Sequence, residues 1–397
     1  MEFNSKAFEL GSKKSIIREI FEYSKKRGAE IGEENVFDFS LGNPSVEPPK
    51  EITETLIKLL TEQNPTALHG YTSAQGDAVV RKNIAENLND RFNLSLTPDL
   101  IYMTCGAAAS LSITLKALIK DSSEECIVFA PFFTEYRVFV NNAGANLVAV
   151  SPMEKTFQVD LDDFKSKITK NTKAVIINSP NNPSGVVYTE ETVKNICNIL
   201  KEKSIEYGKN IFLISDEPYR ELIYDANIKY PFIMNYYDNS IVCYSFSKSL
   251  SLPGERIGYI AVNPNAKDSK ELYLAVCGAG RSLGYVCAPS LFQKVVSENL
   301  DVKVNVDAYK ENRDILYNSL TEIGYDCVKP DGAFYLFVKA LEEDAYKFYE
   351  KAKSHEILVV PCDDFGVKGY VRIAYCVDKK RIISSIPYFK KLFNEYK

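Results

Sequence analysis

Short apolar runs alternate with longer amphipathic segments through most of the chain. The runs are near-continuous, as in strands buried on both faces of a sheet, and they occupy residues 101–103, 127–130, 147–150, 174–177, 211–214 and 241–243. In a longer segment, Ile84, Leu88 and Phe92 recur at the spacing of one buried helical stripe. The alternation predicts an α/β fold with a large, mostly parallel central sheet covered by helices on both faces.

The C-terminal part has a different pattern. Residues 333–338 and 371–374 are strand-like, and Ile382, Ile386 and Phe389 mark the apolar stripe of a final helix. This predicts a smaller α+β domain, and the N-terminal segment, too short for a core of its own, is expected to pack on it. The predicted division is residues 1–42 for the N-terminal segment, 43–290 for the large domain and 291–397 for the small domain.

The composition of the chain argues against nucleic acid and membranes as binding partners. Lys and Arg number 48 against 53 Asp and Glu, so the net charge of −5 offers no positive excess for a nucleic acid. The apolar runs fall short of the roughly 20 residues that a bilayer-spanning helix needs, so no membrane contact is expected. The first residues lack the apolar stretch of a signal peptide, which favours a cytoplasmic protein.

Several common kinds of site are not expected. The nine cysteines form no C-x-x-C pair and the chain has two histidines, so we expect reduced thiols and no metal site. The metalloprotease motif H-E-x-x-H and the NTPase motif G-x-x-x-x-G-K-[ST] are absent. Residues 278–284 imitate a dinucleotide fingerprint, but the third glycine comes one place late.

The strongest chemical signal follows the run at 241–243. Lys248 and Arg256 lie where α/β folds keep ligands, at the carboxyl end of a parallel strand. A lysine there can form a Schiff base with a carbonyl cofactor, and the hydroxyl of Ser245 with the arginine would bind a phosphate. The structural alternative is a solvated lysine in a serine-rich loop.

Other polar residues follow neighbouring runs. Asp216 and Tyr219 come after the run at 211–214, where the carboxylate could keep a pyridine nitrogen protonated. A helix-capping aspartate and a core tyrosine are the alternative. Asn182 lies in a turn after the run at 174–177, and Arg372 is a charge within a strand, suited to clamping a carboxylate or to an exposed edge.

Taken in chain order, these motifs resemble the class I/II aminotransferases of pyridoxal phosphate fold type I, with an aspartate aminotransferase-like pattern. The likeness covers nearly the whole chain, and it rests on the order and spacing of the motifs more than on any one of them. The matching motifs are Gly42-Asn-Pro, Tyr71, Gly106-Ala-Ala, Asn182-Pro-Ser-Gly, Asp216-Glu-Pro-Tyr219, Ser245-Phe-Ser-Lys248, Arg256 and Arg372.

The resemblance implies roles around the ring of pyridoxal 5'-phosphate. Lys248 would form a Schiff base with the cofactor, and Asp216 would pair with its ring nitrogen. Asn182 and Tyr219 would face the 3-hydroxyl group, and Phe133 matches the aromatic residue that stacks on the ring. For Phe133 the alternative is ordinary core packing.

It also implies how the phosphate is held. Ser245, Arg256 and the backbone amides of Ala107 and Ala108 would bind it, in a loop that Gly106 opens. The same small residues would also let a helix pack closely on a sheet, so this stretch alone is a weak signal.

Two further implications concern a second chain and the substrate. Tyr71 matches a tyrosine that reaches the phosphate of the neighbouring subunit, so a homodimer with shared active sites is expected. Gly42, Asn182 and Arg372 would receive the α-carboxylate of the substrate.

The implied reaction is ping-pong transfer of an amino group from an L-amino acid to a 2-oxo acid. A carbon–sulfur β-lyase or another amino acid lyase on the same fold is an alternative, because the cofactor supports several chemistries. A non-catalytic, cofactor-sensing regulator is a third interpretation, and no basic helix-turn-helix segment supports it.

The side-chain specificity stays open at this level. Some aspartate-type relatives carry a lysine in the phosphate loop, but here residues 106–109 read Gly-Ala-Ala-Ala. Arg281 lies near the place where another aspartate-type branch has an arginine, so we hypothesise that Arg281 binds a β- or γ-carboxylate. An exposed arginine in a glycine-rich linker is the alternative.

Overall fold

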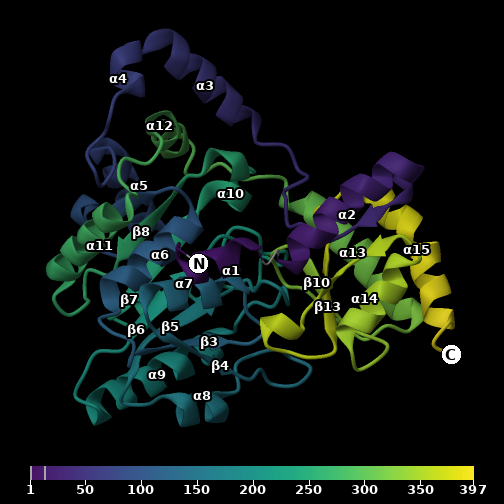
Figure 1. Cartoon of the computed structure of the whole chain (residues 1–397). Coiled ribbons are helices and arrows are strands. Elements are labelled where there is room, and N and C mark those ends of the chain that lie inside the picture. The colour runs from purple at the N-terminus through teal and green to yellow at the C-terminus, as the bar shows by residue number, and fades with distance from the viewer. Residues whose placement is uncertain (1, 13–14) are drawn as a thin grey trace.

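The computed structural model describes residues 2–12 and 15–397, and its larger part is built on a seven-stranded sheet (Figure 1). The strand order is β2–β8–β7–β6–β5–β3–β4. All neighbours from β7 to β4 are parallel, while β8 is antiparallel to both β2 and β7. The strands are β2 (Ile101–Thr104), β3 (Glu125–Phe129), β4 (Asn146–Val150), β5 (Thr172–Asn178), β6 (Phe212–Asp216), β7 (Ser240–Ser245) and β8 (Gly258–Val262). The predicted α/β class with a mostly parallel central sheet is confirmed.

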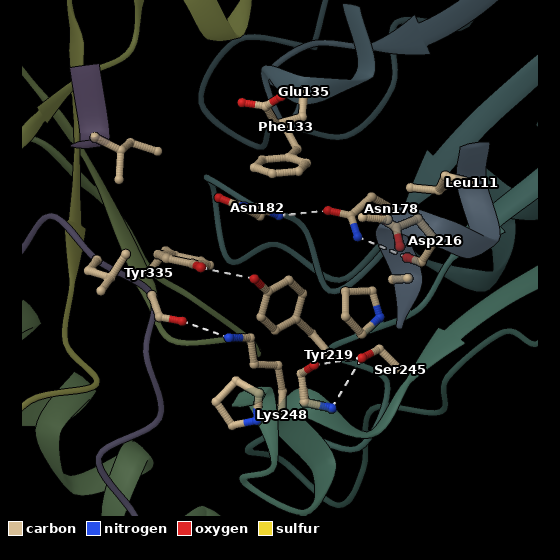
Figure 2. A pocket seen from close by; sticks show the side chains of 18 of the residues that line it. Leu111, Phe133, Glu135, Asn178, Asn182, Asp216, Tyr219, Ser245, Lys248 and Tyr335 are labelled. Atoms are coloured by element: carbon tan, nitrogen blue, oxygen red, sulfur yellow. Dashed lines mark hydrogen bonds between the residues drawn. The ribbon is translucent and has the colours of Figure 1, made fainter. Parts of the chain in front are cut away.

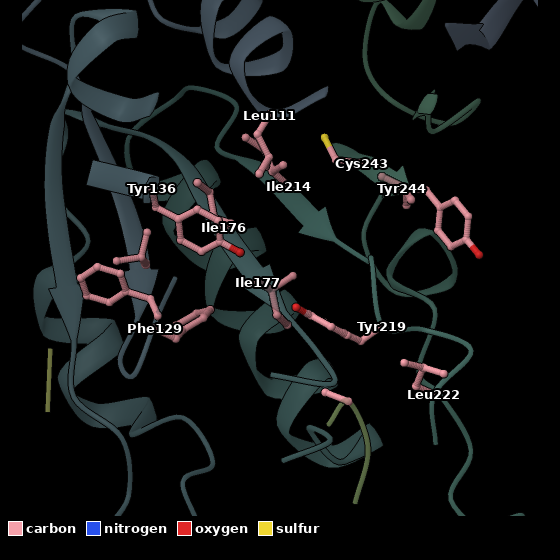
Figure 3. Packing of buried hydrophobic residues seen from close by; sticks show 14 of the residues in the cluster. Leu111, Phe129, Tyr136, Ile176, Ile177, Ile214, Tyr219, Leu222, Cys243 and Tyr244 are labelled. Atoms are coloured by element: carbon pink, nitrogen blue, oxygen red, sulfur yellow. The ribbon is translucent and has the colours of Figure 1, made fainter. Parts of the chain in front are cut away.

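Four of the apolar runs form the interior strands β3, β5, β6 and β7, and the runs at 101–103 and 147–150 form the edge strands β2 and β4. Every residue of β6 and β7 is buried, and Ile176 of β5 and Ile214 of β6 lie in one apolar cluster with Leu111 (Figure 3). Such strands bury apolar side chains on both faces, which explains why their sequences do not alternate. The strand β8, which begins two residues after Arg256, is not among the predicted runs.

Helices surround this sheet. α5 begins after Asp77, whose side chain accepts from the amides of Val79 and Val80, and it buries Ile84 and Leu88 as the stripe predicted. The helix α6 packs against β2, β7, β8, α7 and α11. The helices of this part are α3 (Lys50–Glu62), α4 (Pro65–His69), α5 (Ala78–Phe92), α6 (Ala107–Leu118), α7 (Glu135–Ala143), α8 (Leu161–Lys167), α9 (Glu190–Glu206), α10 (Phe246–Ser249), α11 (Ser269–Leu283) and α12 (Ser290–Glu298).

A smaller antiparallel sheet, β12–β13–β10–β9, lies to the side with its own helices (Figure 1). Its elements are β9 (Cys327–Val328), β10 (Tyr335–Lys339), β12 (Val360–Pro361), β13 (Tyr370–Ala374), α13 (Val306–Ile323), α14 (Ala345–Lys353) and α15 (Lys379–Asn394). The N-terminal segment, with α1 (Ser5–Ser12) and α2 (Ile16–Ile31), adds β1 (Phe37–Asp38), which pairs in parallel with β11 (Ile357–Leu358).

The chain therefore crosses twice between the part with the smaller sheet and the part with the large sheet. β1 pairs with β11 of the C-terminal part in a separate two-stranded sheet, and α12 packs on α3, α4 and α5 before α13 begins. The boundaries at residues 42 and 290 stay a prediction. Among the described residues, no helix is long and apolar enough to cross a membrane.

Candidate active site

Three parallel strands end side by side at one edge of the large sheet. Asn178, the last residue of β5, pairs in register with Asp216, the last residue of β6, and β7 ends next to them at Ser245. A cavity of about 400 Å³ opens at this edge, between the two sheets (Figure 2). Carboxyl ends of parallel strands are the usual ligand position in such folds. This edge is therefore the candidate site.

Asp216 is the central charged group of the cavity. Its carboxyl is 5% exposed, Oδ2 accepts from the Tyr136 hydroxyl at 2.5 Å, and Oδ1 has no hydrogen-bond partner. Burial raises the pKa of Asp216 to about 7; the Tyr136 hydrogen bond opposes this and nearby Glu217 adds to it. An unpaired buried carboxylate oxygen is costly, so the site is suited to a cationic N–H donor.

Two asparagines fix the chain around Asp216. The Asn178 side-chain amide donates to the Asp216 backbone carbonyl at 2.9 Å, and its oxygen accepts from the Asn182 backbone amide at 2.8 Å. The turn after β5 is thereby held against the end of β6. Asn182, itself buried, also lines the cavity, and its Oδ1 accepts from Arg372.

Lys248 enters the cavity from α10, which Ser245 caps by accepting from the Ser247 amide. The Lys248 Nζ donates to the Gly42 carbonyl at 2.7 Å (Figure 2). Desolvation lowers the pKa of Lys248 to about 8, with Arg256 and Arg372 contributing in the same direction. An amine with such a pKa is available as a neutral nucleophile near neutral pH.

A cradle for an anion lies next to Lys248. Gly106 precedes α6 at φ +87°, and a Cβ there would lie 2.7 Å from Nη2 of Arg256. The hydroxyls of Ser245 and Ser247 are 2.7 Å apart, and Arg256 approaches Ser247 at 3.5 Å. Backbone amides at a helix N-terminus, two hydroxyls and a guanidinium form a donor set suited to phosphate.

The same cavity has a second guanidinium that is suited to an anion, that of Arg372. Arg372 of β13 is 2% exposed, and it donates to Asn182 Oδ1 at 3.0 Å and to the Ser40 carbonyl at 2.6 Å, while Nε has no partner. Its guanidinium lies over the Tyr335 ring, 4.6 Å from the centroid. A rigid, buried guanidinium of this kind is suited to binding a carboxylate.

Two tyrosines and a glycine form a further part of the cavity lining. The hydroxyls of Tyr219 and Tyr335 are 2.9 Å apart, and a Cβ on Gly42 would lie 2.0 Å from the Tyr335 hydroxyl. Any larger residue at position 42 would therefore displace Tyr335. Phe133 lines the opposite side, with its ring edge-on to Tyr136 at 5.8 Å.

The structure brings most of the predicted residues together. The cavity is lined by Gly42, Ala107, Ala108, Phe133, Asn182, Asp216, Tyr219, Ser245, Lys248, Arg256 and Arg372, and Gly106 adjoins it through Arg256. Tyr71 and Arg281 do not line it. Tyr71 is 98% exposed and Arg281 is exposed on α11, so either residue would need a second chain to act at such a site.

Sequence reasoning did not single out several residues of the site, among them Tyr136, Asn178, Ser247 and Tyr335. Asn178 directly follows the apolar run at 174–177, and Ser247 lies within the lysine motif, so both carried a positional signal. Tyr136 and Tyr335 are aromatic residues within a helix and a strand, where a core position is the ordinary interpretation.

Comparisons with known proteins agree with this geometry. The family model described as aminotransferase class I and II matches residues 34–383. A probable aspartate aminotransferase of Methanocaldococcus jannaschii is 31% identical over 96% of this chain and 97% of that protein. A probable aspartate/prephenate aminotransferase of Aquifex aeolicus is 32% identical over 91% and 92%.

Solved structures give the same result. An aminotransferase from Eubacterium rectale superposes with a TM-score of 0.98 and 56% identity, covering 100% of both chains. An aspartate aminotransferase from Thermotoga maritima has a TM-score of 0.87 and 27% identity, covering 99% of this chain and 100% of that one.

Proposed function

The chain belongs to the class I and II aminotransferases, and we propose that it uses pyridoxal 5'-phosphate to move an amino group from an L-amino acid to a 2-oxo acid by a ping-pong mechanism. One observation carries this proposal. The Lys248 amine, the Asp216 carboxylate, a phosphate-type cradle and the Arg372 guanidinium line a single cavity.

The donors and acceptors of the cavity fit the three functional parts of that cofactor. The unpaired Oδ1 of Asp216 suits a protonated ring nitrogen, and the cradle around Ser245 and Arg256 suits the phosphate. Lys248 supplies the amine that would hold the aldehyde. When bound, the cofactor supplies a carbonyl that condenses with amines and a ring that takes up the electron pair of the substrate α-carbon.

The remaining residues position the amino acid. Arg372 binds its α-carboxylate as a two-point ion pair, with the Asn182 amide and the Gly42 backbone at the same end. Tyr219 donates toward the ring hydroxyl. The Lys248 amine would remove the proton from the α-carbon of the substrate and hold it at Nζ. The lowered pKa keeps this amine able to accept a proton near neutral pH.

Mixing the loaded protein with single L-amino acids tests the function. With a reactive amino acid we expect one equivalent of the matching 2-oxo acid and conversion of the cofactor to its aminated form, with no ammonia. Addition of a second 2-oxo acid should restore the starting spectrum. Pyruvate and ammonia released without any 2-oxo acid would instead indicate a lyase, and no change with any amino acid would favour a regulator.

We also propose a homodimer whose subunits share active sites. Tyr71 is 98% exposed, and Leu274, Tyr285 and Val286 add exposed apolar surface on and after α11. A tyrosine that serves the neighbouring subunit would be exposed in a single chain in this way. A cytoplasmic location stays a prediction.

Subunit complementation tests the sharing of sites. Tyr71→Ala and Lys248→Ala chains are co-expressed with different tags, and the mixed dimer is purified. One of its two sites would combine an intact Lys248 with an intact Tyr71. We therefore expect about half of the activity of the unmutated dimer, well above that of the Tyr71→Ala or the Lys248→Ala homodimer. Activity no higher than that of the Tyr71→Ala dimer would place Tyr71 outside the partner's site.

A further inference from the structure

A carboxylate without a partner stands at the edge of the active-site cavity. Glu135 is the first residue of α7, it is half-buried, and it lines the cavity beside Phe133 (Figure 2). No hydrogen bond or ion pair joins its carboxylate to another of the described residues. The roles proposed above for the cofactor and for the α-carboxylate leave Glu135 unused.

The helix explains why this side chain faces the cavity. Phe139 lies one turn further along α7 and lines the same cavity, because residues four apart share one helix face. Tyr136 points the other way, into the core, where its hydroxyl meets Asp216. The orientation of Glu135 is therefore fixed by the same helix that holds Tyr136.

Apolar side chains share the cavity lining with Glu135. Phe133 and Phe139 lie close to it in sequence, and Ile17 and Leu41 line the cavity from the N-terminal segment, which also contributes Ser15. A substrate side chain that extends from the α-carbon would thus meet both apolar surface and a carboxylate.

The cations that the structure describes in the cavity lining already have other partners. Among the described residues, the cations that line the cavity are Lys248, Arg256 and Arg372, and each has a place in the cofactor or α-carboxylate sites. The phosphate loop contributes only alanines. Arg281 lies outside the cavity, so only a second chain could bring it there.

We propose that Glu135 determines side-chain specificity: it selects amino acids with an apolar stem and an uncharged or cationic hydrogen-bond donor at the end, and it disfavours side-chain carboxylates. The inference rests on the proposed aminotransferase function. Two carboxylates a few ångströms apart in a partly desolvated cavity repel by enough for about a tenfold to hundredfold discrimination.

Matched substrate pairs test this. The ratio of kcat/KM for asparagine over aspartate, and for glutamine over glutamate, is measured for the parent and for Glu135→Gln, with alanine as an internal standard. We expect both ratios to fall at least about tenfold in the variant, while alanine changes little. Glu191→Gln is the matched control, because Glu191 also lies in the first turn of a helix but is exposed and does not line the cavity.

A binding measurement separates this inference from the proposed function. Calorimetry gives the dissociation constants of succinate and of its monoamide for the loaded protein, with no turnover. Glu135→Gln should tighten succinate relative to the monoamide by about tenfold. Unchanged ratios in both experiments overturn the inference, as does selective loss of succinate binding in Arg281→Ala without an effect of Glu135→Gln. If no amino acid reacts, the proposed function fails, while the succinate comparison still decides the role of Glu135.

Discussion

Replacing Lys248 with alanine should lower the rate of amino transfer by at least about 10⁴-fold, because one side chain supplies both the amine that holds the cofactor and the base that moves the α-proton. The 2.7 Å contact with the Gly42 carbonyl and the pKa of about 8 show that this amine is fixed in place and readily deprotonated. The measurement is single-turnover conversion of the cofactor with the best amino acid, together with the loss of the yellow colour of the parent.

The control is Lys270→Ala, since Lys270 is an exposed lysine of α11 outside the cavity. It should retain the parental rate and colour. Circular dichroism and thermal unfolding of both variants separate loss of chemistry from loss of fold. A Lys248→Ala protein that still transfers amino groups at the parental rate would remove Lys248 from the mechanism.

The part of the site that could be predicted from sequence lies at strand ends. Apolar runs buried on both faces are visible as runs, and a polar residue directly after such a run must emerge at the edge of the sheet. Asp216 and Lys248 were found in this way, and the parallel register of β5, β6 and β7 brings their strand ends together. Chemistry suggested the roles of these two residues, and the resemblance to a known family supplied those of the others.

The remaining features depend on distant parts of the chain. Tyr136 reaches Asp216 because α7 packs against α6 and β4, and Tyr335 meets Gly42 because β10 of the smaller sheet faces the N-terminal segment. Both residues look like core aromatics in the sequence. The exposed position of Arg281 likewise follows from where α11 packs, which no local pattern specifies.

Two acidic residues, Asp216 and Glu217, are buried next to each other at the site, and they differ in whether a cation compensates their charge. Glu217, fully buried next to Asp216, is paired with Arg220 at 2.8 Å, and the Arg220 guanidinium lies 4.2 Å from the centroid of the Tyr244 ring. Arg220 thus compensates the charge of Glu217. The carboxyl of Asp216 accepts a hydrogen bond from the neutral Tyr136 hydroxyl and, among the described residues, has no such cation. The unbalanced charge of Asp216 is what a cationic ring would compensate.

Asp216→Asn should therefore lower kcat by about 10³-fold, since an ion pair at about 4 Å is worth roughly 4 kcal/mol at an effective dielectric constant of 20. The amide keeps the shape of the side chain and removes its charge. Tyr136→Phe should have a smaller effect, about tenfold, because it removes one hydrogen bond to the carboxylate and leaves the charge in place. The exposed Asp238 provides the control variant Asp238→Asn, which should match the parent.

The pH dependence of cofactor binding makes this test specific. The pKa of Asp216 in the cofactor-free protein is about 7, so below that pH a proton occupies the carboxylate that a protonated ring needs. Parental affinity for the cofactor should fall by about tenfold per pH unit below 7, because binding must displace that proton. In Asp216→Asn this fall of affinity at low pH should vanish. In Tyr136→Phe it should begin at a higher pH, since the lost hydrogen bond had lowered the pKa of Asp216. If the affinity of Asp216→Asn for the cofactor still falls below pH 7 as it does in the parent, another group governs the pH dependence of binding.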